Sequence, residues 1–348
     1  MAVRHHSTIG EHMNITEIQP QGHLVAVHAH PDDETLFTGG IIARWSAAGL
    51  PVTVVTCTRG ELGESIPEDL ADLPQSPHTF GRYRATELRE ALLTLTASSS
   101  ITHFFLDELP LPTAQNLDAS AQFTDSGMQW AGEGLPGVSG QATAAPNAPA
   151  TALTRGDLDE QAQRLLLLLR ETSPSFIVTY EPGGGYGHPD HVRAVDIVQR
   201  ARAIDGASPD ASLMQTQFLA SVLPEEVSRW GRAQLAHYPH AEEAHLPDPF
   251  GPLPSISAHQ PQQIFTVSTG SLIRPLLTAL ATYRTQVHWV SSAPEPHPTL
   301  SWHHHDVKLR GWYALSNNIL SPLFDCETYA DLGQLSADLQ TRQVAFPL

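Results

Sequence analysis

The sequence predicts an α/β fold in which helices cover both faces of a mostly parallel sheet, followed by a smaller carboxy-terminal α+β part. Short apolar runs rich in β-forming residues alternate with segments of helical periodicity over the first 207 residues. The runs are apolar on both faces, which is typical of parallel strands covered by helices on each side. After residue 207 this alternation changes, so we expect a separate, smaller unit there.

The first 207 residues contain four expected strands, each followed by a helix. The expected strands are residues 24–29, 51–57, 102–106 and 176–179, and the expected helices are residues 35–48, 82–96, 158–171 and 190–203. In the helix 82–96, Leu88, Ala91, Leu92 and Leu95 share one face. Right-handed crossovers between parallel strands then give a Rossmann-like sheet.

The remaining segments suggest three parts. Residues 1–22 are an expected N-terminal extension, and residues 23–207 form the Rossmann-like domain, with an irregular insert rich in Gly, Ala and Pro at about 131–152. Residues 208–348 form the expected second domain over the cleft. It contains expected strands at 217–223 and 264–268, expected helices at 224–235 and 271–286, and a proline-rich loop at 237–262.

Composition limits the possible partners. The 348 residues include 19 Lys and Arg against 37 Asp and Glu, a formal charge of -18. This charge argues against nucleic acid or an acidic membrane surface and suits a small neutral substrate such as a sugar. Two cysteines make no disulfide framework, and the chain has neither an apolar leader nor a run long enough to span a membrane. We therefore expect a cytoplasmic bacterial protein, of undetermined oligomeric state.

Polar residues gather where the first expected strand ends. Pro31 stops that strand, and His30, Asp32, Asp33 and Glu34 occupy the turn before the next helix. In an open α/β sheet this is the edge where ligands bind. A divalent cation would relieve the clustering of like charge, and zinc accepts such ligands. The alternative is a helix N-cap with solvated acids beside it.

A second turn has the same character and favours the metal interpretation. After the expected strand 175–180, a glycine-rich loop leads to His188-Pro-Asp-His191 at the start of a helix. His30, Asp33 and one histidine of this turn would give three protein ligands and one open position, the pattern of a catalytic zinc site. Spacing alone does not choose between His188 and His191. Iron(II) could occupy the same ligands.

Two sequence signatures carry a family resemblance. Ala29-His-Pro-Asp-Asp-Glu34 and Gly187-His-Pro-Asp-His191 resemble those of the zinc-dependent N-acetylglucosaminyl deacetylases, the LmbE or PIG-L-like family. Further blocks fall in order at 56–64, 84–88, 125–128, 184–191 and 314–318. Together they most resemble the mycothiol-pathway members, which act on N-acetylglucosaminyl-inositol. The resemblance is dense from residue 24 to about 201 and patchy from there to residue 283.

The resemblance implies a role for each matched residue. It implies one Zn²⁺ per chain held by His30, Asp33 and His191, with Asp32 as the general base. It also implies that Tyr186 stabilises the oxyanion, that His188 is a charged partner near the leaving amine, and that Asp190 orients His188. Sugar contacts would come from Arg84, Asp125 and Glu64. Glu34 is expected to support the site without binding metal.

The implied activity is zinc-dependent hydrolysis of the acetamide of N-acetylglucosaminyl-inositol in mycothiol biosynthesis. The main alternative is mycothiol S-conjugate amidase, and the third hypothesis is a non-catalytic sugar-binding module. Gly187, Leu36 and Phe37 stand where the amidases tend to have Pro and Lys, which favours the deacetylase. Cys57 is expected to be a buried residue rather than a nucleophile. The tract His303-His-His305 is expected to be a solvated cluster rather than part of the zinc site.

Overall fold

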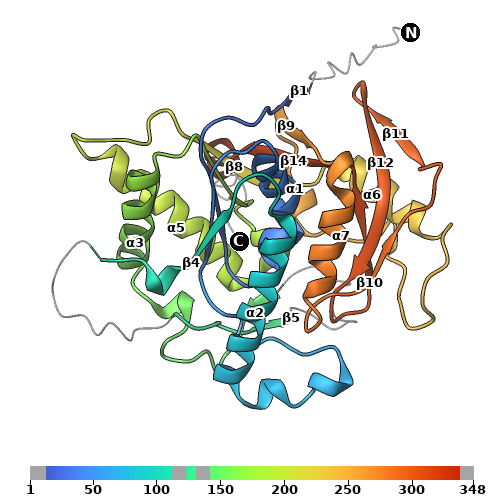
Figure 1. Ribbon diagram of the computed structural model, residues 1–348, viewed down its shortest axis with the longest axis horizontal. Coiled ribbons are helices and arrows are strands. Elements are labelled where there is room, and N and C mark those ends of the chain that lie inside the picture. Colours follow the sequence, from blue (N-terminus) through green and yellow to red (C-terminus); the bar gives the residue numbers. More distant parts are fainter. Residues whose placement is uncertain (1–12, 112–122, 131–141, 338–348) are drawn as a thin grey trace, which may run out of the picture.

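The computed structural model describes residues 13–111, 123–130 and 142–337. Parts of the expected N-terminal extension (1–12) and of the expected insert (131–141) therefore lie outside the described residues. The main sheet has eight strands in the order β1-β9-β14-β8-β7-β2-β3-β4 (Figure 1). These strands are β1 (Asn14–Glu17), β2 (Leu24–His28), β3 (Val52–Thr56), β4 (Ile101–Phe105), β7 (Phe176–Tyr180), β8 (Gln217–Val222), β9 (Gln263–Ser268) and β14 (Cys326–Asp331).

The pairing confirms the expected, mostly parallel sheet. β2 pairs in parallel with β3 and β7. The other parallel pairs are β3 with β4, β7 with β8, and β1 with β9. β14 is antiparallel to both of its neighbours, β8 and β9. Every residue of β2 is buried, and its side chains alternate between two apolar clusters: Val25 and Val27 belong to one, and Leu24 and Ala26 to the other. A strand buried on both faces explains the continuous apolar run.

Helices cover both faces of this sheet. The helices are α1 (Asp33–Ala47), α2 (Pro77–Leu95), α3 (Leu158–Thr172), α5 (Pro189–Gly206), α6 (Glu225–Leu235) and α7 (Ile273–Thr282). α3 and α5 pack together in one cluster, and α1, α2 and α7 pack together in the other (Figure 1). Shorter turns are η1 (Glu68–Leu70), η2 (Leu73–Gln75), η3 (Leu106–Glu108), η4 (Leu153–Arg155), α4 (Gly184–Gly187), η5 (Ser255–Ser257) and η6 (Gly270–Leu272). No helix within the described ranges is long and apolar enough to cross a bilayer.

The carboxy-terminal segments contribute to two sheets. β8, β9 and β14 extend the main sheet past residue 207, so the expected boundary falls between two elements of one sheet. The division into domains at that residue stays a prediction. A second, antiparallel sheet consists of β10 (His288–Ser292), β11 (Thr299–Trp302), β12 (His305–Ala314) and β13 (Leu320–Phe324). β5 (Met128–Trp130) and β6 (Ala142–Ala144) form a short antiparallel pair.

The strand order reverses direction beside β2. From β2 the chain proceeds to β3 and β4 on one side, whereas β7 and β8 lie on the other. Such a reversal of strand order separates the loops that leave the two central strands, and ligands bind at this point in open α/β sheets. The loops after β2 and β7 carry the two histidine-containing turns. The topology thus brings both signatures to one edge of the sheet.

Candidate active site

Three side chains from the two turns meet with the spacing of metal ligands. His30 Nδ1 lies 3.2 Å from Asp33 Oδ2, His191 Nε2 lies 3.3 Å from the same oxygen, and the two nitrogens are 3.3 Å apart. All three residues are buried. A tetrahedral ion bound at about 2.0–2.1 Å separates its ligand atoms by about 3.3 Å. The three atoms therefore fit one face of a tetrahedral site, with the fourth position open.

The outer nitrogens of both imidazoles have partners of their own. His191 Nδ1 lies 3.0 Å from the carbonyl oxygen of Gly184, and His30 Nε2 lies 3.2 Å from Asp190 Oδ2. A ring that donates its outer N–H to an oxygen presents the lone pair of the other nitrogen inward, as metal-bound histidines do. The donor set thus fits a divalent ion in tautomer as well as in distance.

The charges around these ligands also favour a cation. Burial alone would lower the pKa of His30. The carboxylates of Asp125, Asp190 and Asp33 outweigh burial, so the net shift of this pKa is upward. Burial raises the pKa of Asp33, but His191 and His30 outweigh burial and hold that pKa well below its usual range. The three carboxylates thus favour positive charge at the His30 ring, and the two histidines favour negative charge on the Asp33 carboxylate.

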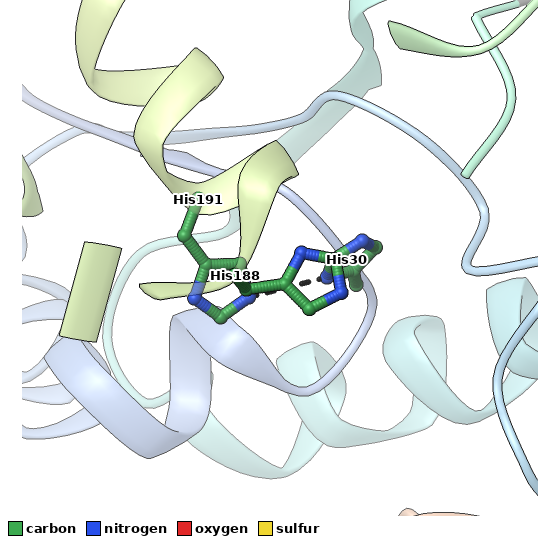
Figure 2. A group of neighbouring side chains, drawn as sticks. All are labelled: His30, His188 and His191. Carbon is green, nitrogen blue, oxygen red and sulfur yellow. Dashed lines mark hydrogen bonds between the residues drawn. The ribbon is translucent and has the colours of Figure 1, made fainter. Parts of the chain in front are cut away.

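His188 lies next to both ligand histidines (Figure 2), 4.6 Å from His30 and 4.7 Å from His191 between ring centroids. His30, His188 and His191 could together hold an ion, as could His30, Asp125 and Asp190, since in each group the ligand atoms lie within 4.8 Å of one another. The His30–Asp33–His191 set is tighter, and we favour it for that reason. Burial, followed by the charges of His30 and His191, lowers the pKa of His188, which favours a neutral ring where a charged one was expected.

The carboxylate of Asp190, which was expected to orient His188, has Ser126 and His30 as its hydrogen-bond partners instead. This carboxylate accepts from the backbone N–H of Ser126 at 2.8 Å and lies against His30, whereas the backbone N–H of Asp190 donates to His188 Nδ1 at 3.1 Å. Asp190 therefore holds the His188 ring through its main chain and the His30 ring through its side chain. The sequence does not reveal this, because Ser126 lies 64 positions away.

Asp32 has a strained backbone beside the ligands. Its φ is 112°, in a region that residues other than glycine rarely adopt. Its backbone N–H donates to Glu34 Oε2 at 3.2 Å, and its carboxylate lies 3.4 Å from Arg84 Nη2. Burial raises the pKa of Asp32 well above its usual range, although Arg84 acts in the opposite direction. A buried, ligand-adjacent carboxylate with increased basicity suits a general base.

The expected sugar contacts have different surroundings. Arg84 is 3% exposed, and its guanidinium donates to the carbonyl oxygens of Pro31 at 2.7 Å and Gly60 at 2.9 Å. It therefore braces the turn that carries Asp32. Asp125 is buried and accepts from the backbone N–H of Gly127 at 2.7 Å, and Glu64 is exposed.

Several residues that the sequence did not single out support this site. The ring of Tyr180 stacks on His191 at 4.3 Å, and its hydroxyl accepts from the backbone N–H of Ala29. Glu61 accepts from the backbone N–H of Asp125 at 3.0 Å. Glu61 also borders a cavity of about 400 Å³ lined by Arg59, Leu62, Pro77, His78, Arg82, Thr124, Pro149 and Thr151. Glu61 lies inside the block 56–64 that resembles the family, and this position in the sequence could have identified it as a candidate site residue.

Two other predictions concern residues away from the ligands. Cys57 is fully buried, and burial raises the pKa of its thiol far above its usual value, so it does not act as a thiolate nucleophile. His303 and His304 form the turn between β11 and β12, His305 is the first residue of β12, and all three are exposed. Within the described part of the chain, each candidate group of metal ligands includes His30, and these three histidines belong to none of them.

Comparisons with known proteins identify the family of this chain and several relatives. Residues 25–202 match the family model described as PIG-L, GlcNAc-PI de-N-acetylase. The chain is 36% identical to 1D-myo-inositol 2-acetamido-2-deoxy-alpha-D-glucopyranoside deacetylase 1 of Saccharopolyspora erythraea, over 88% of each protein. It is 35% identical to the corresponding deacetylase of Actinosynnema mirum, over 88% of this chain and 90% of that one. Among solved structures, N,N'-diacetylchitobiose deacetylase from Pyrococcus horikoshii is similar over 76% of this chain and 70% of that one, with 16% identity and a TM-score of 0.40.

Proposed function

Because this chain belongs to the PIG-L family of de-N-acetylases, we propose that it is a metal-dependent N-deacetylase that hydrolyses the acetamide of N-acetylglucosaminyl-inositol. The products are the free amine and acetate, in the pathway to mycothiol. The observation that carries the proposal is the tetrahedral spacing of His30, Asp33 and His191 beside the buried carboxylate of Asp32. The relatives that share 35–36% identity are named for this substrate.

In the proposed reaction, His30, Asp33 and His191 would hold the ion, and Zn²⁺ is the proposed metal. Bound zinc acidifies water and polarises the acetyl carbonyl. Asp32 takes a proton from the attacking water as the new C–O bond forms. The Tyr186 hydroxyl donates to the oxygen on which negative charge develops. As the C–N bond breaks, the proton that Asp32 accepted passes to the amine nitrogen, and the neutral ring of His188 lies beside the proposed ligands as a polar neighbour of the leaving amine.

The metal assignment is tested by elemental analysis of purified protein. We expect one divalent transition-metal ion per chain and loss of activity on treatment with a chelator. His30→Ala and His191→Ala should bind the metal much more weakly, whereas His303→Ala, at an exposed turn, should bind it as the wild type does. Fully active protein without stoichiometric metal would contradict the proposal.

The substrate assignment is tested by measuring release of free amine from three compounds: N-acetylglucosaminyl-inositol, N-acetylglucosamine and a mycothiol S-conjugate. We expect the highest kcat/KM with the first, because the inositol ring adds binding contacts. Equal values for the first two would contradict an inositol-directed site. Faster cleavage of the conjugate would instead identify an S-conjugate amidase with the same metal chemistry.

A further inference from the structure

Glu181, the residue directly after β7, binds the glycine-rich loop that follows it. Its side chain is fully buried. Oε2 accepts from the backbone N–H of Gly183 at 2.6 Å, and Oε1 accepts from that of Gly185 at 2.8 Å. Each oxygen also has a side-chain partner: Ser255 Oγ donates to Oε1 at 2.6 Å, and His259 Nε2 lies 2.6 Å from Oε2. One carboxylate therefore makes four close polar contacts with two segments of the chain.

The loop that Glu181 binds leads directly to the proposed catalytic groups. Gly184 lies between the two bound N–H groups, and its carbonyl oxygen is the partner of His191 Nδ1. Gly185 has a φ of +79°, and the next residue is Tyr186, whose ring lies edge-on to His191 with centroids 5.1 Å apart. Fixing the N–H groups of Gly183 and Gly185 therefore sets the direction of the Gly184 carbonyl and the point from which Tyr186 extends.

The other two partners of Glu181 come from far along the chain. Ser255 and His259 lie at η5 and just after it, between α6 and β9. Ser255 Oγ also lies 3.2 Å from the carbonyl oxygen of Gly183. A Cβ atom on Gly183 would sit 2.7 Å from Ser255 Cβ, so the two segments are in close contact. The proline-rich segment thus supports the loop from its outer side.

We propose that Glu181 is a positioning residue that fixes the loop so that Gly184 orients His191 and Tyr186 faces the reacting carbonyl, with Ser255 and His259 holding the carboxylate in place. This inference rests on the proposed deacetylase function for the role of Tyr186. The alternative is that Glu181 only stabilises the fold by closing a turn. A purely stabilising role would change the free energy of unfolding without a specific connection to Tyr186 or to the metal.

The decisive variant is Glu181→Gln, because glutamine keeps the shape but replaces one acceptor oxygen with an NH₂ group that faces a backbone N–H. We expect kcat on N-acetylglucosaminyl-inositol to fall about 10- to 100-fold, with KM nearly unchanged, since small displacements of catalytic groups have effects of this size. Adding Glu181→Gln to Tyr186→Phe should lower kcat by less than about 2-fold further, because a misplaced hydroxyl contributes little to lose.

Glu327→Gln is the matched control. Glu327 also accepts from two backbone N–H groups, those of Gly40 and Ile41, and from the Tyr329 hydroxyl, but it lies in β14. This variant should leave kcat close to the wild-type value. Any small change in kcat that Glu327→Gln causes should be the same in the wild type and in Tyr186→Phe. Two results would overturn the positioning role of Glu181 towards Tyr186. One is a normal kcat in Glu181→Gln, and the other is an effect of Glu181→Gln on kcat that is as large in Tyr186→Phe as in the wild type.

Two measurements do not depend on the substrate. In metal-free protein, the amides of Gly183 and Gly185 should exchange with solvent faster in Glu181→Gln than in the wild type or in Glu327→Gln. Metal affinity should fall about 10-fold, as it does when the outer partner of a ligand histidine is disturbed. Unchanged exchange and unchanged affinity would overturn the inference. If the wild type does not hydrolyse the substrate, but both changes occur, the proposed function fails and the role of Glu181 towards His191 stands.

Discussion

Asp32 combines a strained main chain with contacts from two neighbours, one to its backbone N–H and one to its carboxylate. A non-glycine residue at a φ of 112° raises the energy of the fold by about 1–3 kcal/mol. Glu34 accepts the Asp32 N–H, and Arg84 lies against the carboxylate and bonds the carbonyl of Pro31. Strain retained beside the proposed metal ligands is consistent with a carboxylate that must point in one direction.

Asp32 and Asp33 should therefore respond differently to substitution. Asp32→Asn keeps the shape and removes the basicity, so it should retain the metal while kcat falls about 10²–10⁴-fold. Asp33→Ala removes a proposed ligand and should lose the metal. Elemental analysis and steady-state kinetics on both variants test this. An Asp32→Asn protein with full metal and normal kcat would remove Asp32 from the mechanism.

Arg84 offers a way to separate bracing from substrate contact. If Arg84 acts through the turn at Pro31, Arg84→Met should lower kcat at least about 10-fold and leave KM within about 2-fold, because the general base is displaced while substrate contacts remain. A residue that binds the sugar equally in ground and transition states would instead raise KM. Initial-rate measurements over a range of substrate concentrations distinguish the two results.

At the scale of residues, the proximity of His30, Asp33 and His191 could be predicted because these residues lie in two short segments at strand ends, whereas their roles stay predictions. The partners of these groups could not be predicted in the same way. The hydrogen bonds from the Ser126 N–H to the Asp190 carboxylate and from Arg84 to the Gly60 carbonyl depend on how the loops fold. Contacts between distant loops leave no local pattern in one sequence.

Among the elements, the loop after β7 depends on its glycines. Gly185 has a φ of +79°, and a Cβ atom there would lie 2.8 Å from the Phe37 ring. Gly49, after α1, has a similar φ of +73°, but a Cβ there would meet nothing within 4 Å. The two positions share a positive φ, which would strain any other residue, and they differ in the space around the Cβ position.

Alanine at these two positions should separate the two effects. Gly49→Ala should lower the free energy of unfolding by about 1–2 kcal/mol, the strain of a left-handed alanine. Gly185→Ala should lower it more and also reduce kcat, because the ring of Phe37 or the loop must move. Urea unfolding and kinetics measure both. Equal destabilisation with normal kcat in both variants would show that the loop absorbs the methyl group freely.

The sequence predicted the strands β2, β3, β4, β7, β8 and β9 of the central sheet, but not β1, β14 or the strands of the second sheet. β2, β3 and β7 are short runs buried throughout, and that pattern stands out in the sequence. β12 instead reads His-Asp-Val-Lys-Leu-Arg-Gly-Trp-Tyr-Ala and mixes buried with exposed positions. It becomes a strand by pairing with β10, β11 and β13. Pairing between segments, rather than local preference, determines such strands.

Across the whole molecule, Glu327 joins β14 to the middle of α1 through the N–H groups of Gly40 and Ile41. Burial raises the pKa of Glu327 to about 7, against 4.5 for an ordinary glutamate. The folded chain therefore holds a proton that the unfolded chain releases between these two values. The contribution of this group to stability is fully present below about pH 4.5 and decreases as the pH rises to 7.

Replacing Glu327 with Gln should remove this dependence. The free energy of unfolding of the wild type should lose up to about 1.4 kcal/mol per pH unit through this one group in that window, and the variant should show a correspondingly flatter profile. Urea unfolding at pH 5, 6 and 7 measures the difference. Parallel profiles for the two proteins would mean that Glu327 is ionised throughout the window.

The edge pairing of β1 with β9 has a consequence for synthesis. Asn14 and Gln263, which bond through their side chains, are 249 positions apart. On a ribosome that makes the chain from its N-terminus, β1 leaves the exit tunnel long before its partner exists. The apolar strand β2, close behind, pairs with β3 at residues 52–56 and with β7 at residues 176–180, so one of its edges lacks a partner until β7 is made. Unpaired strands in nascent chains promote association between chains. We therefore expect the segment that contains β1 and β2 to be a binding site for chaperones during synthesis.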